Sequence, residues 1–147
     1  MKAFSNLLSD LILTSSRNRK LSLLEQYFSS TPDPDRGYAL AALTGSLNFK
    51  NIKASFFKDL IKEKQDEHLF DLSYDYVGDL AETISLLWDQ EKGGNMPRLS
   101  SLFENLKKAK TDELKNYIIN ILNISTADQR WAFIKLFTGG LRIGVSS

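Results

Sequence analysis

The sequence contains no cysteine, and this excludes disulfide bonds, thiolate metal sites and cysteine nucleophiles together. It contains one histidine, His68, so a pair of histidines on a metal ion is excluded as well. No stretch approaches the roughly 18 consecutive apolar residues that a membrane-spanning helix needs. We therefore expect no membrane partner, and the missing cysteines are consistent with a reducing compartment.

The motifs that carry nucleotide chemistry are missing too. Neither G-x-x-x-x-G-K-[ST] nor G-x-G-x-x-G occurs in the chain. His68 follows Glu67 in a polar stretch, which is typical of a surface histidine rather than a catalytic base. Asp71 and Asp75 lie one helical turn apart and could share a metal ion or a proton, but no third ligand accompanies them. A standalone enzyme is therefore disfavoured.

The amino-terminal segment MKAFSNLLSDLILTSSRNRK has a basic residue and several apolar residues, as a secretory signal peptide would. However, Asn6 and Asp10 interrupt the apolar region, and no small-x-small cleavage site follows. The segment therefore predicts the start of a mature cytoplasmic protein.

The composition fits one globular domain, because 42% of the 147 residues are hydrophobic and 25% are charged. The net charge of +1 hides a strong segregation. Residues 66–91 contain eight acidic residues and no Lys or Arg, so the rest of the chain has 19 basic and 10 acidic residues and a net charge of +9. Two interpretations stay open: a basic face for a polyanion, or solvated helix faces that differ in sign.

Apolar residues recur with the helical spacing i, i+3, i+4 and i+7 along almost the whole chain, and no segment alternates with a period of two. The pattern predicts an all-α, compact single domain of about eight short helices. Most of the 16 aromatic residues fall on these stripes, where core packing explains them better than base stacking. The stripes lie within Phe4–Ile12, Leu21–Phe28, Arg36–Leu43, Ile52–Ile61, Leu69–Tyr76, Leu80–Trp88, Leu99–Leu106, Leu114–Leu122 and Trp131–Ile134.

Local signals at helix ends refine this prediction. Gly78 is expected to end one helix and Asp79 to cap the next, within the stretch VGDLAETISLL. The acidic residues of this stretch would repel phosphate, so we assign it mainly to structure. Ser125 and Asp128 have the spacing of a capping box, so the last helix is expected to start near them. The closing stretch FTGGLRIGVSS is not explained by periodicity, and Arg142 is its only charge.

An ordered set of motifs covers essentially all 147 residues: FSNLL, TSSRNRKLSLL, YALAALTG, VGDLAET and FIKLFTGGLRIGVS. In this order they resemble the N-terminal DNA-binding domain of bacterial ATP-dependent DNA ligases, the branch related to the eukaryotic replicative ligases. In that family, a nucleophilic lysine in a K-x-D-G motif follows in the adenylation domain, and this chain has no such motif. The resemblance therefore implies a domain, residues 1–147, excised from a longer ligase and non-catalytic alone.

The resemblance also implies partners and cofactors. We expect a monomer that grips the minor groove and phosphate backbone of nicked double-stranded DNA without sequence specificity. The catalytic adenylation and OB domains of the same polypeptide would then seal the nick in repair or replication. ATP and Mg²⁺ would serve that parent ligase, and no cofactor is expected in this chain.

Two turns are the expected DNA contacts. Backbone N–H groups of glycines that lack Cβ can approach phosphate closely, and an arginine can add a charge-assisted hydrogen bond. A helix opening with SSRNRK could hold a second phosphate. In the larger eukaryotic relatives the position of Gly140 tends to be basic, so here its contact would be made by the backbone alone. The candidate DNA-binding residues are Arg142, Gly139, Gly140, Gly144, Arg17, Arg19 and Lys20.

One alternative function is a non-catalytic, all-α protein-interaction module. It would explain the helices and the acidic segment 66–91, but not the two basic turns or their order.

Overall fold

The computed structural model of the chain describes residues 2–44, 52–88 and 96–138. Within these ranges every regular element is an α-helix and none is a strand, which confirms the all-α prediction, with nine helices described where about eight were expected. The helices are α1 Lys2–Leu13, α2 Arg17–Ser30, α3 Asp35–Leu43, α4 Ala54–Lys64, α5 Glu67–Val77, α6 Leu80–Leu87, α7 Leu99–Lys108, α8 Thr111–Ile124 and α9 Ala127–Thr138.

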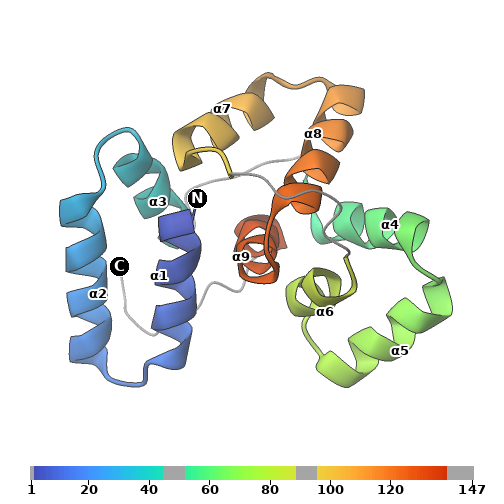
Figure 1. Cartoon of the computed structure of the whole chain (residues 1–147), viewed down its shortest axis with the longest axis horizontal. Helices are drawn as coiled ribbons and strands as arrows, with labels where there is room; N and C mark the ends of the chain where they lie inside the picture. The colour runs from blue at the N-terminus through green and yellow to red at the C-terminus, as the bar shows by residue number, and fades with distance from the viewer. Residues whose placement is uncertain (1, 45–51, 89–95, 139–147) are drawn as a thin grey trace.

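The last helix, α9, lies at the centre of the domain (Figure 1). Helices α1, α4 and α6 pack against it, α2 packs on α1, and α5 packs on α6 and α4. As a result, α2 and α5 lie at opposite ends of the long axis of the molecule (Figure 1). A central helix has to be apolar on more than one side, which explains why α9 shows little amphipathic pattern in sequence.

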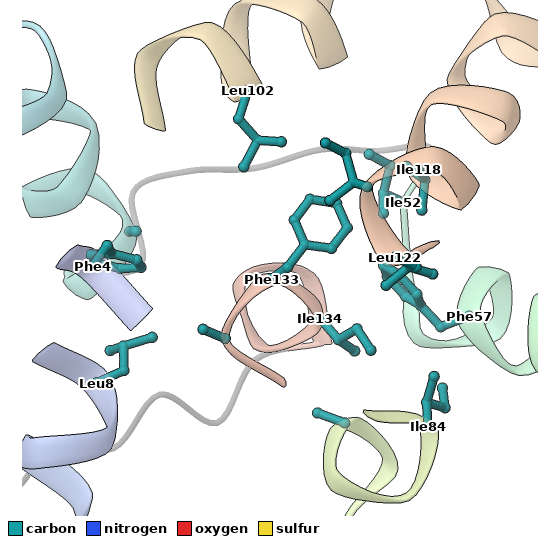
Figure 2. Packing of buried hydrophobic residues seen from close by; sticks show 14 of the residues in the cluster. Phe4, Leu8, Ile52, Phe57, Ile84, Leu102, Ile118, Leu122, Phe133 and Ile134 are labelled. Atoms are coloured by element: carbon teal, nitrogen blue, oxygen red, sulfur yellow. The ribbon is translucent and has the colours of Figure 1, made fainter. Parts of the chain in front are cut away.

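The core forms where the neighbours of α9 meet it. Figure 2 shows the ring of Phe133 directed toward Leu102 of α7 and Ile118 of α8. Ile134, the next residue, lies on the side of Ile84 of α6 (Figure 2). All five side chains are at most 1% exposed, so the central helix is enclosed by close-packed apolar groups.

Helix α5 exists where the sequence predicts it, but its apolar stripe faces outward. Leu69, Leu72 and Tyr76 are all exposed, and Phe70 is the buried residue of this helix. Periodicity alone would place the stripe in the core. The interpretation of that stripe as a core face is therefore wrong, because α5 reaches the rest of the domain through a different side.

The start of α9 also differs by one residue from the prediction. Thr126 accepts the N–H of Gln129 at 3.3 Å through its hydroxyl oxygen, and the Gln129 side chain accepts the N–H of Thr126 at 3.0 Å. The Ser125 hydroxyl instead donates to the carbonyl of Leu122 at 3.0 Å. The Ser125–Asp128 capping box is therefore wrong, because a threonine followed three residues later by glutamine satisfies both orphan donors here.

Among residues 2–44, 52–88 and 96–138, no helix combines the length and the hydropathy needed to cross a bilayer.

Candidate nucleic-acid interface

The turn between α1 and α2 forms the N-terminus of α2 as the sequence predicts. Ser16 is the N-cap: its hydroxyl oxygen accepts the backbone N–H of Arg19 at 3.3 Å. The first main-chain bond of the helix runs from the N–H of Lys20 to the carbonyl of Ser16 at 3.0 Å. The N–H groups of Arg17 and Asn18 have no acceptor among the described residues, so two donors remain for an external anion.

Three cations surround this helix end. Arg17 and Arg19 are exposed, and Lys20 is partly exposed. No described carboxylate forms an ion pair with any of them, and the first turn of α2 contains no acidic residue. The positive end of the helix dipole and the three side-chain charges therefore act together on the same volume of solvent.

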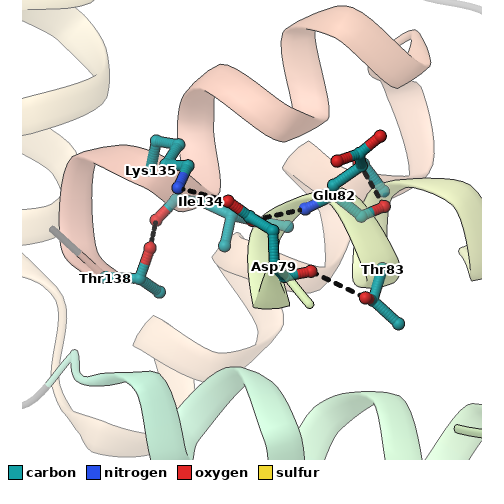
Figure 3. Close-up of polar contacts among 7 residues, drawn as sticks. Asp79, Glu82, Thr83, Ile134, Lys135 and Thr138 are labelled. Carbon is teal, nitrogen blue, oxygen red and sulfur yellow. Dashed lines mark hydrogen bonds and ion pairs between the residues drawn. The ribbon is translucent and has the colours of Figure 1, made fainter. Parts of the chain in front are cut away.

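The closing glycine-rich turn lies outside the described residues. This applies to Gly139, Gly140, Arg142 and Gly144, whose contacts stay predictions. The described chain ends on Thr138 in the last turn of α9, where the Thr138 hydroxyl donates to the carbonyl of Ile134 at 3.1 Å (Figure 3).

The end of α9 is tied to the start of α6 by an ion pair. Lys135 Nζ lies 2.7 Å from Asp79 Oδ2, and the two side chains are 14% and 34% exposed (Figure 3). The other oxygen of the same carboxylate accepts the N–H of Glu82 at 3.0 Å and so caps α6. One side chain therefore caps the start of α6 and ties it to the last turn of α9.

Gly78 and Asp79 confirm their predicted roles. Gly78 ends α5 in the left-handed conformation, with φ of 79°, and its N–H donates to the carbonyl of Tyr74. Burial alone would raise the pKa of the Asp79 carboxyl, but the hydrogen bonds from Lys135 and Glu82 outweigh it, and the pKa lies below its ordinary value. Asp79 is paired with Lys135 and Glu82 is exposed, and the expectation that this stretch repels phosphate stays a prediction.

The end of α1 lies beside the start of α9. Residues Ile12 and Leu13, just before the α1–α2 turn, line a pocket together with Ala127 and Trp131 from the first turns of α9. With 12 residues and a rise of about 1.5 Å per residue, α9 spans roughly 18 Å from this pocket to Thr138, where the described residues end.

The charge segregation of the sequence is only partly a segregation in space, because Lys62 of α4 pairs with Glu67 of α5 at 3.3 Å. Helix α5 carries exposed Glu67, Asp71 and Asp75 at one end of the long axis, and the basic N-terminal turn belongs to α2 at the other (Figure 1). The basic region that one interpretation required and the solvated helix faces that the other required are thus both present. A polyanion would meet the α2 end without passing the acidic α5.

A buried arginine, Arg130 of α9, was missed by sequence reasoning. It is 3% exposed, and its guanidinium donates to the carbonyls of Ser85 and Trp88 at the end of α6. A further bond of 2.9 Å reaches the carbonyl of Ser125, which ends α8. A signal was available, because Arg130 precedes the buried Phe133 by three residues and therefore lies on the same face of the helix.

The residues considered for other chemistry lie apart from this interface. His68 is exposed, as predicted, and so are Asp71 and Asp75. Over the described ranges, no three His, Cys, Asp or Glu side chains come together in a way that could hold a metal ion. The interpretation of these carboxylates as a solvated helix face is the one that the structure favours.

The comparison with known families covers the whole chain: residues 1–147 match the family model described as DNA ligase N terminus. No curated protein and no solved structure matches the chain. The family match confirms the resemblance to the N-terminal domain of ATP-dependent DNA ligases, and the all-helical fold of the described residues agrees with it, while the bacterial branch stays a prediction.

Proposed function

Because the chain belongs to the family of N-terminal domains of ATP-dependent DNA ligases, we propose that it binds duplex DNA around a nick, so that the catalytic domains of the same polypeptide can seal the break in repair or replication. The observation that supports this function best is the N-terminus of α2. Within the described residues it combines two unused N–H donors, three cations without an ion-pair partner and a first turn free of acidic residues.

This arrangement suits the DNA backbone rather than the bases. Helix N-termini and flexible basic side chains bind phosphate oxygens, which are the same at every base pair. Contact without sequence preference is what an enzyme that must seal any nick requires.

The second contact in this proposal is the turn after α9. The N–H groups of Gly139, Gly140 and Gly144 would meet phosphate, and Arg142 would add a charge-assisted hydrogen bond. The ion pair between Lys135 and Asp79 supports this role, since it fixes the helix end from which the turn departs. Together with the N-terminus of α2, this turn would hold the duplex at more than one phosphate.

In the same proposal the chain acts as a monomer and does not itself carry the adenylation step. It lacks the K-x-D-G motif that holds the nucleophilic lysine in the family. ATP and Mg²⁺ would be used by the catalytic domains. Incubation with labelled ATP should therefore leave the chain unlabelled, and a stable covalent adduct of AMP on any of its lysines would contradict this assignment.

DNA binding is tested by fluorescence anisotropy on a labelled nicked duplex at several salt concentrations. We expect the affinity to fall steeply with salt, because condensed counterions are released on binding. The double variant Arg17→Ala/Arg19→Ala should reduce the log–log salt slope by about one to two units. Lys108→Ala is the matched control, since Lys108 is an exposed cation on α7, away from the α1–α2 turn (Figure 1).

Three outcomes would contradict the proposal. Binding that ignores salt would exclude phosphate contacts, and strong preference for one duplex sequence would exclude backbone recognition. Equal losses in the double variant and in Lys108→Ala would show only a general effect of net charge.

A further inference from the structure

An apolar surface on the side of α6 that faces away from the core is unexplained by DNA binding. Within the described ranges eight large hydrophobic side chains are exposed, and five of them line two neighbouring pockets. The five are Ile12 and Leu13 of α1, Leu72 and Tyr76 of α5, and Leu86 of α6. Such clustering marks an interaction site more often than scattered exposed leucines do.

The two pockets adjoin each other. The first, of about 430 Å³, lies between the end of α1, α6 and the start of α9, and the second, of about 370 Å³, lies between α5 and α6. Leu86, which is 65% exposed, lines both and forms the ridge between them. We call the two pockets and this ridge the apolar groove.

Both charged residues that line the apolar groove are acidic. Glu82 and Asp128 line the first pocket, and Asp71 and Asp75 are the neighbours of the groove residues on α5. No Lys or Arg lines either pocket, and none occurs in residues 66–91. This surface would repel phosphate, so it is not a continuation of the DNA contact.

We propose that the apolar groove binds a basic amphipathic helix of a partner protein. Apolar side chains one helical turn apart would enter the two pockets on either side of Leu86, as in other helix-in-groove complexes. Lys and Arg on the flanks of that helix would meet Glu82 and Asp128. The apolar side chains of the groove require an apolar face on the partner helix, and the acidic residues that line it require basic residues beside that face.

A second copy of this chain is a poorer occupant than a partner protein. Its most strongly amphipathic described helix, α7, ends on Lys107 and Lys108 and has the required pattern. However, its apolar side chains Leu102, Phe103 and Leu106 are already buried in the core. Among the described helices, α7 could therefore reach the groove of another copy only by leaving its own domain.

The proposal is tested with two synthetic helical peptides of about 14 residues, or roughly four turns, that share one leucine face. One peptide carries lysine at its polar positions and the other carries glutamate. Anisotropy of each labelled peptide is measured with the full chain. We expect the lysine peptide to bind at least about tenfold more tightly than the glutamate peptide.

Leu86→Asp separates apolar contact from charge attraction. The variant adds a negative charge, which would strengthen a purely electrostatic complex, but it removes the ridge of the groove. We expect the variant to bind the lysine peptide at least about tenfold more weakly than the unmodified chain does. Leu40→Asp is the matched control, because Leu40 on α3 is 54% exposed and lines neither pocket, and it should stay within about twofold of the unmodified chain.

Thermal melting shows whether each variant folds. If Leu86→Asp lowers the melting temperature, Tyr76→Asp takes its place with the same expected loss, since that ring is 93% exposed. Equal effects of the groove and control variants, tighter binding after Leu86→Asp, or equal binding of the two peptides would overturn the proposal.

Two further measurements complete the design. Concentration-dependent dimerisation that Leu86→Asp abolishes would assign the apolar groove to a second copy and so overturn the assignment to a partner. Binding of the nicked duplex by Leu86→Asp should equal that of the unmodified chain. Failure of this inference is therefore distinguishable from failure of the DNA-binding function.

Discussion

Replacing Arg130 with methionine tests whether one buried guanidinium holds three helix ends together. The substitution keeps a long side chain in the same space and removes the charge and the donors. The carbonyls of Ser85, Trp88 and Ser125 would then lose the donor that the structure gives them at the ends of α6 and α8. These carbonyls have no partner inside their own helices, since they belong to last turns or caps.

The expected cost follows from opposing contributions. Hydrogen bonds to a charged group stabilise by about 1.5–3 kcal/mol each, so three of them amount to roughly 4–9 kcal/mol. Release of a buried charge from its desolvation penalty offsets several kcal/mol of this. We therefore expect Arg130→Met to lower the free energy of unfolding by about 3–5 kcal/mol, a large share of the 5–15 kcal/mol typical of a domain.

Urea unfolding followed by far-UV circular dichroism measures the change. The control is Arg98→Met: the Arg98 side chain is 65% exposed and its Nε lies 3.6 Å from Asp35. Asp35 is only 14% exposed, but it keeps its bond from the Ser100 N–H, so loss of the exposed arginine should cost about 1 kcal/mol or less. Arg130→Lys keeps a charge but not the planar fork, so an intermediate loss is expected. A loss for Arg130→Met no larger than that of the Arg98 control would refute the argument.

Three other predictions concern Asp79, Gly78 and Arg142. Asp79→Asn should destabilise the domain near neutral pH and have a smaller effect in acid. Because the pKa of Asp79 is lowered in the folded state, its contribution to the free energy of unfolding is present above the unfolded pKa of about 3.9 and is lost as pH falls through the folded pKa. A double-mutant cycle with Lys135→Met across a pH series measures this contribution. Gly78→Ala should cost about 1–2 kcal/mol in urea unfolding, because an L-residue is strained at φ of 79°, and a stability equal to the unmodified chain would exclude that strain. Arg142→Ala should weaken binding of a nicked duplex by about 1–3 kcal/mol and reduce the log–log salt slope by about one unit, with the melting temperature unchanged. If Arg142 is only a solvated residue after the helix, the substitution would leave DNA binding as it was. Arg142→Lys should give an intermediate loss of affinity.

The helices and their local caps could be predicted because their signals lie within a few residues. Gly78 and Asp79 are adjacent, and a glycine followed directly by an aspartate between two apolar stripes is typical of one helix ending and the next beginning. The start of α9 was misplaced by one residue because Ser125 and Thr126 can both act as N-caps. Only the partner three residues on distinguishes them, and Gln129 forms the reciprocal bond.

The contacts between distant helices could not be predicted, because no periodicity links their residues. Lys135 and Asp79 are 56 positions apart in the sequence. Ser100 and Asp35 are 65 positions apart, and the backbone N–H of Ser100 donates to the Asp35 carboxylate at 2.9 Å. Burial alone would raise the pKa of Asp35, but the Ser100 hydrogen bonds and Arg98 outweigh it and hold that pKa below its ordinary value. Such pairs depend on the tertiary arrangement, which a single sequence does not specify.

In the two candidate binding regions, too, the local features were predictable and the tertiary ones were not. The N-terminus of α2 was predictable from SSRNRK, since a serine cap and the following cations are local features. The apolar groove was not, because the stripe of Leu72 and Tyr76 looks like any core-facing stripe until α5 is placed. Sequence periodicity indicates that one face of a helix is apolar, but the tertiary packing determines whether another part of the same chain covers that face.

The central position of α9 has a consequence for how the domain opens in solution. Global unfolding has to separate α9 from α1, α4 and α6, whereas α2 detaches mainly from α1 and α5 mainly from α6 and α4. Amide hydrogens of α9 should therefore exchange with deuterium most slowly, and those of α2 and α5 through smaller local openings. An anion bound at the first turn of α2 would slow amide exchange in α2. Exchange in α5, at the opposite end of the molecule, would stay unchanged and would serve as an internal reference.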